Sequence, residues 1–196
     1  MLNIVDRRSI ETRSRMLLEK YCPENLRDHS AIPIERLAEK LGLDIEYQYL
    51  TKFGEDVLGK LVCTDGLTTY YDMDEQRYML LKVKADTIII EVRLADRADE
   101  GRYRFTVAHE LAHWLLHKSK IVEGEAAFTE SGNTEMERQA DFMASTLLMP
   151  LNSVKRYFYS LNGKCRSSEM YVEVMAERFC VSRQAMRIRL EDHNLI

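Results

Sequence analysis

Residues 104–117, RFTVAHELAHWLLH, constrain the fold more than any other part of this 196-residue chain. The segment contains no glycine or proline, and its apolar residues recur at the spacing of one helical face. It therefore predicts an amphipathic helix. Residues four apart on such a helix are neighbours about 6 Å from each other, so the imidazoles of His109 and His113 can reach one metal ion.

Glu110 lies directly after the first of these histidines and completes the pattern HExxH. A carboxylate in this position can hold a water on the metal without binding the ion itself. Catalytic zinc usually has three protein ligands and leaves its fourth position to water. The pattern therefore predicts a zincin centre in which His109 and His113 bind Zn²⁺ and Glu110 is the general base.

A third ligand is expected on the helix predicted at 134–148. Glu137 and Asp141 are four residues apart and in phase with apolar residues further along, so we expect both carboxylates on the core-facing side. Glu135 is expected to point away. We assign Glu137 as the third ligand and Asp141 as the carboxylate that accepts an imidazole N–H from His109 or His113, outside the ligand shell.

His117, one turn beyond the motif, is the other candidate near the metal. It lies about 12 Å along the helix axis from His109, and three residues of one straight helix cannot converge on an ion tetrahedrally. We therefore expect His117 to support the ligands from behind or to lie at the rim of the site.

The rest of the chain predicts an α+β fold with a small β-sheet. Helical patterns cover 4–21 and 33–41, and β patterns follow at 43–50, 57–63, 67–71 and 87–92. The dipeptide Asp65-Gly66 predicts a hairpin between the second and third of these strands. From 102 onward the pattern is helical, at 105–116, 134–148, 152–161, 168–179 and 182–192. We expect a metallopeptidase domain at 1–150 and a helical segment at 151–196.

Composition excludes several classes of protein. Hydrophobic residues make up 45% and charged residues 31% of the chain, as in an ordinary globular domain. The net charge of −4 does not indicate a general polyanion binder. Because no apolar run is long enough to span a bilayer and the four cysteines form no CxxC pair, we expect a cytoplasmic protein that does not enter a membrane.

The motif segments resemble those of the ImmA/IrrE metallopeptidases of bacteria and their mobile elements. The similarity covers 104–117, the stretch ERQADFMASTLLMP at 137–150, and PIERLAEKLGLDIEY at 33–47. Ala112 replaces a glycine that is usual in the family. The resemblance implies a zincin-like fold, with zinc at His109, His113 and Glu137 and with Glu110 as general base. It also implies that the substrate is a helix-turn-helix transcriptional repressor, whose cleavage relieves repression in stress response or mobile-element control.

The stretch MAERFCVSRQAMRIRL at 175–190 is similar to a helix-turn-helix. Two departures weaken this similarity, because Cys180 occupies a turn position that usually needs glycine and Arg189 a position that is normally apolar. Residues from 155 onward carry a net charge of only about +3. We expect a structural or repressor-docking role for this tail and regard DNA binding as the less favoured alternative.

Two functions from different classes remain open. The first is a zinc-dependent endopeptidase that cuts a repressor. The second is a regulatory binding module whose zinc is structural and which acts by holding repressor or DNA. A structural site does not need a carboxylate beside its metal, so Glu110 favours the enzyme.

Overall fold

The computed structural model describes residues 6–52, 57–95, 100–122 and 134–196. Its helices and strands confirm the predicted α+β class. In chain order they are α1 (Arg7–Tyr21), α2 (Pro23–Asp28), α3 (Ile34–Lys40), β1 (Asp44–Gln48), β2 (Gly59–Val62), β3 (Gly66–Asp72), β4 (Arg77–Val83), β5 (Thr87–Glu91), the 3₁₀ turn η1 (Val92–Leu94), α4 (Glu100–Val122), α5 (Thr134–Leu148), α6 (Leu151–Ser160), α7 (Ser168–Phe179) and α8 (Arg183–Asp192).

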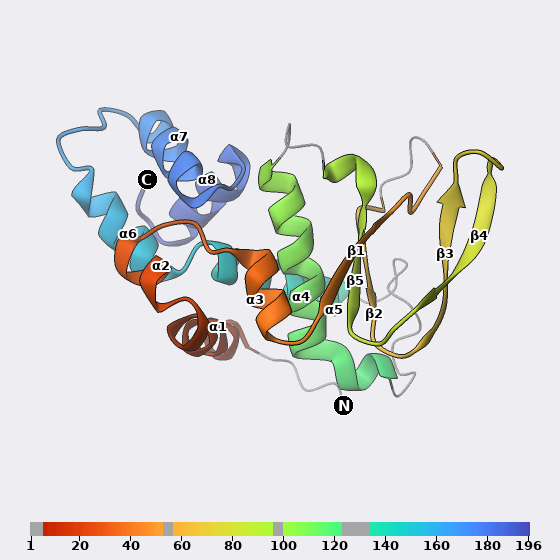
Figure 1. Cartoon of the computed structure of the whole chain (residues 1–196). Helices are drawn as coiled ribbons and strands as arrows, with labels where there is room; N and C mark the ends of the chain where they lie inside the picture. Colours follow the sequence, from red (N-terminus) through yellow and green to blue (C-terminus); the bar gives the residue numbers. More distant parts are fainter. Residues whose placement is uncertain (1–5, 53–56, 96–99, 123–133) are drawn as a thin grey trace.

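The strands form two small layers at one end of the molecule, with the helices gathered at the other (Figure 1). β5 is the centre of a three-stranded sheet, parallel to β1 and antiparallel to β2. β3 and β4 form a separate antiparallel hairpin. Every residue of β5 is buried, because Ile88 and Ile90 pack into the helical core while Ile89 packs with Leu50 and Val83. This position explains why the three central residues of the strand are all isoleucine.

The predicted hairpin around Asp65-Gly66 is wrong. β2 forms its ladder with β5, and the turn carries the chain out of that sheet into β3. β3 instead pairs with β4, a strand that the sequence pattern did not reveal. Asp65 stabilises the crossing, since its Oδ1 accepts the backbone N–H of Ala85 at 2.7 Å. The Asp65-Gly66 dipeptide therefore predicted a turn at the correct place, but it did not predict which strands pair with each other.

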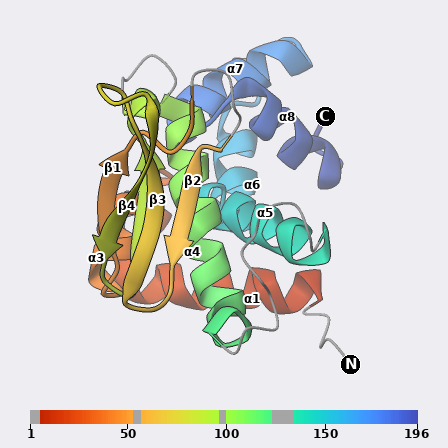
Figure 2. The same ribbon diagram turned by 90° about the vertical axis from the view of Figure 1, so that its right-hand side faces the viewer.

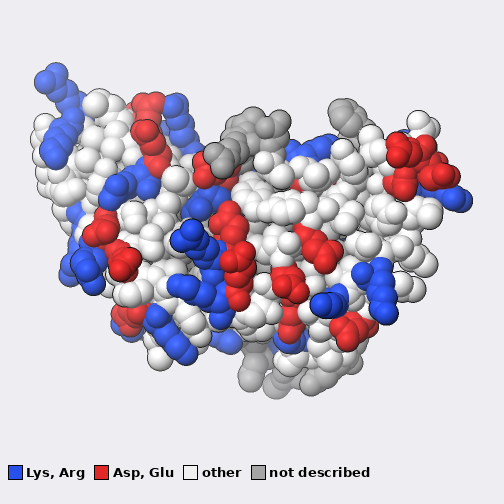
Figure 3. All heavy atoms as spheres, viewed as in Figure 1, with Lys and Arg blue, Asp and Glu red and all other residues white. Residues whose placement is uncertain are grey.

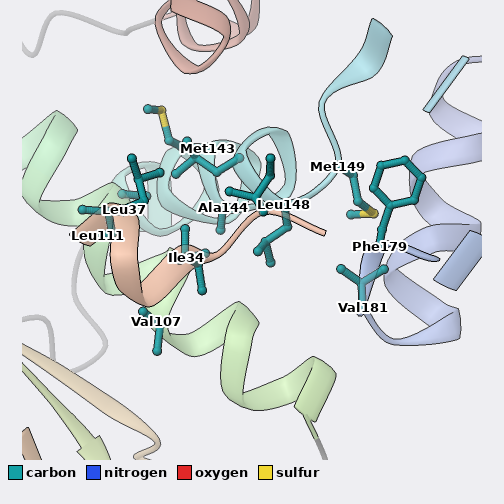
Figure 4. Packing of buried hydrophobic residues seen from close by; sticks show 14 of the residues in the cluster. Ile34, Leu37, Val107, Leu111, Met143, Ala144, Leu148, Met149, Phe179 and Val181 are labelled. Atoms are coloured by element: carbon teal, nitrogen blue, oxygen red, sulfur yellow. The ribbon is translucent and has the colours of Figure 1, made fainter. Parts of the chain in front are cut away.

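α4 runs through the middle of the molecule, between the sheet and the other helices (Figure 2). Figure 4 shows its residues Val107 and Leu111 near Ile34 and Leu37 of α3 and Ala144 of α5. The same buried cluster continues through Met149 into the C-terminal helices, where it includes Phe179, Val181, Met186 and Leu190. The C-terminal helices thus share one apolar core with the rest of the described chain.

Cys180 and Arg189, the two tail residues that depart from a typical helix-turn-helix, both have a structural role. Cys180 adopts the left-handed conformation predicted for the turn, with φ 50°, and Ser182 caps α8 through its hydroxyl. The Arg189 side chain is buried; its Nε donates to the Met149 carbonyl at 3.1 Å and its Nη2 to Glu11 at 2.6 Å. An arginine is accommodated at this normally apolar position because the Nε and Nη2 atoms of its buried guanidinium both have acceptors.

Surface charge is mixed on the face seen in Figure 3. Acidic and basic side chains alternate over the helical half, and acidic residues gather at the tip of the β3–β4 hairpin. In the described part of the chain, no helix combines the length and the apolarity that crossing a membrane requires.

Candidate metal centre

α4 is held in place by polar contacts at both ends. Near its C-terminal half, Trp114 Nε1 and Lys118 Nζ donate to the carboxylate of Asp86, just before β5, at 2.8 and 2.7 Å. At its start, the buried Arg104 donates to the carbonyls of Ile32 at 2.6 Å and Cys180 at 3.0 Å. These contacts fix the helix that carries the HExxH pattern against both the sheet and the C-terminal helices.

Two imidazole nitrogens and one carboxylate meet between α4 and α5. His109 Nε2 lies 3.0 Å from His113 Nε2 and 3.2 Å from Glu137 Oε2, and His113 Nε2 lies 3.4 Å from Glu137 Oε1. Bonds of about 2.0–2.1 Å at tetrahedral angles place ligand atoms about 3.3 Å apart. Each of the three measured distances is close to this spacing. One ligand atom from each residue lies within 4.8 Å of the others, so the three residues form a candidate metal-binding group.

Asp141 supports the first histidine from outside this group. Its Oδ1 lies 2.9 Å from His109 Nδ1, so the carboxylate accepts the Nδ1–H and leaves the Nε2 lone pair directed at the other ligand atoms. The expectation that Glu137 and Asp141 face the core is wrong, because 39% and 57% of their side-chain surfaces are exposed. The core-facing positions of α5 are those of Ala140 and Ala144, and the two acids lie on the flank that meets α4.

His117 supports the second histidine. Its Nδ1 lies 3.3 Å from His113 Nδ1, and its Nε2 lies 3.0 Å from Gln139 Oε1. Gln139 in turn donates through Nε2 to Glu135 at 3.3 Å, which orients the amide oxygen toward His117. Burial lowers the pKa of both imidazoles and favours their neutral forms, and with both neutral the chain is satisfied when His117 donates from Nε2 and His113 from Nδ1. The Nε2 lone pair of His113 is then free to bind a metal.

Glu110 is buried behind the three ligand atoms, against strand β2. A Cβ atom added to Gly59 would lie 2.9 Å from Glu110 Oε1 and 2.7 Å from the methyl group of Thr106. The strand can approach α4 this closely only because residue 59 has no side chain. Gly59 thus sets the space available to the carboxylate.

Burial shifts the titration of the central residues in the metal-free protein. It raises the pKa of Glu110 to about 7, with Glu137 adding to the shift and His109 opposing it. It lowers the pKa of His113 to about 3, and the charges of His109 and His117 act in the same direction. Burial also acts to lower the pKa of His109, but the hydrogen bond to Asp141 and the surrounding carboxylates outweigh it and raise that pKa.

Two residues of this site were missed in the sequence. Gln139 lies two positions beyond Glu137, but only the packing of α5 on α4 reveals that it reaches His117. Gly59 offered a weak signal, because a glycine inside a predicted strand often marks a close approach of backbone to another group.

Comparison with known proteins agrees with the geometry. The model of the IrrE N-terminal-like domain, peptidase family M78, matches residues 70–191, which include all of the residues that carry the candidate ligands. No curated protein matches the chain. A solved structure described as a Mycobacterium tuberculosis transcriptional regulator aligns over 92% of this chain with 11% identity and a TM-score of 0.48. This chain spans 55% of the length of that one. Peptidases of family M78 are metal-dependent, and on the extent of its match the chain belongs to the IrrE N-terminal-like domain family of these peptidases.

Proposed function

We propose that this protein is a zinc-dependent endopeptidase that cleaves a helix-turn-helix transcriptional repressor. The observation that carries the proposal is the convergence of His109, His113 and Glu137, whose two imidazole Nε2 atoms lie 3.0 Å apart and 3.2 and 3.4 Å from the two oxygens of one carboxylate. Two imidazoles and one carboxylate form a typical ligand set for catalytic zinc and leave a position for water or substrate. A divalent ion held there supplies Lewis acidity, which polarises the scissile carbonyl and acidifies water at the site.

Glu110 has the properties of the general base in this mechanism. Its carboxylate accepts the proton of the attacking water and later delivers it to the nitrogen of the leaving amine. Burial suits the group to both roles, since it brings the pKa of Glu110 close to neutrality before a cation is bound. A bound cation beside Glu110 lowers that pKa and favours the basic form at neutral pH.

The surroundings of the centre are suited to a polypeptide substrate. β2 is an edge strand of its sheet, hydrogen-bonded only to β5 among the described strands, and an edge strand can pair with an extended peptide. A groove of about 870 Å³ includes Asp141 in its lining, which combines charged residues with apolar side chains such as Phe105, Phe142 and Ile188. Backbone pairing along β2 together with side-chain contacts in the groove favours an endopeptidase that reads several residues of its substrate.

The tail is better suited to a structural or docking role than to DNA binding. Arg183 forms an ion pair with Glu173, and Arg187 lies 3.4 Å from Glu169. These partners reduce the charge available for phosphate contacts. A gel shift at about 150 mM salt tests this part of the proposal. Specific binding to the protein's own promoter that is lost in the Arg183→Ala, Arg187→Ala double variant would contradict it.

The proposal as a whole is tested by sequencing the neighbouring genes and, where one encodes a helix-turn-helix repressor, incubating that repressor with this protein. We expect the zinc-loaded protein to cut it at one site, identified by sequencing the fragments. Glu110→Gln keeps the size of the side chain but cannot accept a proton, so this variant should retain zinc and lose two or more orders of magnitude in cleavage rate. Undiminished cleavage by the variant would remove Glu110 from the mechanism, whereas no cleavage by the zinc-loaded wild type would favour a binding module with structural zinc.

A further inference from the structure

The groove that includes Asp141 is lined by residues of α1, α4, α5 and α8. Figure 2 shows α8 above α5, the two helices that contribute most of this lining. The residues from α5 extend from Glu135 to Met149, so the groove is about 21 Å long at the helical rise per residue. That length holds about six residues of an extended peptide.

The groove is continuous with the candidate metal centre. Asp141, which lines the groove, accepts the Nδ1–H of the candidate ligand His109 at 2.9 Å. Phe105, one turn before His109 on α4, also lines the groove, and the centroids of these two rings lie 6.4 Å apart. A polypeptide whose scissile bond lies at the metal centre can therefore continue into the groove.

Contacts with α4 and with the core fix α8 as a wall of the groove. A Cβ atom added to Gly101, in the first turn of α4, would lie 2.7 Å from the backbone nitrogen of Ser182, the N-cap residue of α8. Met186 and Leu190 are fully buried in the apolar core, and their burial sets the rotation of the helix. Ile188 then lies on the face of α8 that lines the groove.

The charged residues of the lining do not favour a substrate of either charge. The lining contains three arginines and three acids, which are Arg7, Arg102, Arg138, Glu135, Asp141 and Asp192. Within this set Arg138 pairs with Glu135 at 3.7 Å, and the guanidinium of Arg7 lies over the ring of Phe142 at 5.0 Å. Selection of a substrate residue therefore depends on the apolar side chains, of which Ile188, at 51%, is the most exposed.

We propose that the groove binds a large apolar side chain of the substrate polypeptide and that Ile188 of α8 determines this specificity. This role for Ile188 rests on the proposed peptidase function. The substrate segment lies extended in the groove, and its apolar side chain packs against Ile188 and Phe142, which removes apolar surface of both partners from water. A charged side chain is rejected there, because it would lose its hydration without gaining a partner.

Cleavage of a peptide library tests the proposal. The zinc-loaded full chain is incubated with peptides randomised at every position, and mass spectrometry gives the residue preference at each position around the cut bond. The wild type should favour leucine, isoleucine, methionine and phenylalanine at one position. Ile188→Arg places a positive charge in the wall and should shift that position toward aspartate and glutamate by about tenfold or more, with the other positions unchanged. Leu80→Arg changes a 64% exposed leucine of β4 outside the groove and should keep the wild-type preference.

Steady-state kinetics separates a substrate contact from a disturbance of the metal centre. On a peptide with leucine at the selected position, Ile188→Arg should raise KM by about tenfold or more, with a smaller change in kcat. A lower kcat at unchanged KM would overturn the proposal, because it would place the effect of Ile188 at the reacting bond rather than in binding.

The remaining outcomes distinguish this role from the proposed function and from other occupants of the groove. If the wild type cuts the library and Ile188→Arg cuts it with the same preference, only the role of Ile188 is wrong. If the wild type cuts no peptide, the proposed peptidase function fails and the role of Ile188 fails with it. Sedimentation equilibrium tests a second copy of the chain as the occupant. A wild-type dimer that Ile188→Arg converts to a monomer would assign the groove to that copy and overturn the proposal.

Discussion

Asp141 of α5 accepts the Nδ1–H of His109 of α4 at 2.9 Å, and this hydrogen bond sets the direction of the imidazole toward the other two ligand atoms. Asp141→Ala removes the acceptor but no ligand, so metal affinity should fall by roughly 10 to 100-fold rather than vanish. Asp141→Asn keeps an acceptor oxygen and should lose less. Competition with a chromogenic chelator measures these affinities. Glu177→Ala, which removes an exposed carboxylate of α7, is the control; equal affinities in all variants would mean that Asp141 does not support the site.

Glu137 and Glu135 provide a matched test of the third ligand. The Glu137 carboxylate lies within 3.4 Å of both imidazole nitrogens, whereas the Glu135 carboxylate accepts from Gln139 at 3.3 Å and pairs with Arg138 at 3.7 Å. Elemental analysis should find about one zinc per chain in the wild type and in Glu135→Ala. Glu137→Ala should lose the metal on dialysis. The reverse result would assign the ligand to Glu135.

Gly59 should tolerate no side chain, because a Cβ would lie 2.7 Å from Thr106 and 2.9 Å from Glu110. Gly59→Ala is expected to lower the free energy of unfolding by about 1–3 kcal/mol and to reduce peptidase activity by displacing the Glu110 carboxylate. Gly66→Ala is the control, since its nearest neighbouring atom would be 4.0 Å away. Urea denaturation and an activity assay measure both effects. Wild-type stability and activity in Gly59→Ala would show that β2 can withdraw from α4.

The metal-free protein should show two opposing pH dependences. The folded-state pKa of His113, about 3, lies below its ordinary value of 6.5, so stability from this residue is lost as the pH falls below 6.5. The folded-state pKa of Glu110, about 7, lies above its ordinary value of 4.5, so its contribution grows as the pH falls from 7 to 4.5. Between pH 6.5 and 4.5 the two effects offset each other.

Substitution separates these effects. In the presence of a chelator, Glu110→Gln should lose stability more steeply than the wild type as the pH falls from 6.5 to 4.5. His113→Gln should lose it less steeply or gain it. Chemical denaturation at several pH values measures the slopes, and a shift in the same direction in both variants would contradict the assignment.

Arg189 should matter for stability far more than its exposed neighbour Arg187. Arg189→Met leaves the carboxylate of Glu11 and the carbonyl of Met149 without their donor, at a cost of about 2–4 kcal/mol. Arg187→Met removes only a pair with Glu169, whose side chain is 73% exposed, and should cost less than about 1 kcal/mol. Urea denaturation compares the two variants. Equal losses would show that the buried contacts of Arg189 do not stabilise the tail.

The local pattern of the sequence predicted every helix except α2, and it predicted the three candidate ligand residues but not Gln139 or Gly59 beside them. Helical periodicity depends on neighbours three and four residues apart, so the helices α5 and α7 have the predicted ends, and His109, Glu110 and His113 lie on one helix as expected. Glu137 and Asp141 do meet this helix, although the periodicity placed them on the core-facing side of α5 and not on the flank where they lie. Their metal-binding and supporting roles remain predictions.

Contacts between distant segments were decided only by the tertiary structure. Strand pairing depends on which edges the packed layers leave open, so β3 joined β4 rather than the strand that precedes it in the chain. The approach of Gly59 to Glu110 and the link from His117 to Gln139 depend on how separate elements pack. Local periodicity carries no information about these contacts, because it records which face of an element is apolar but not which partner covers it.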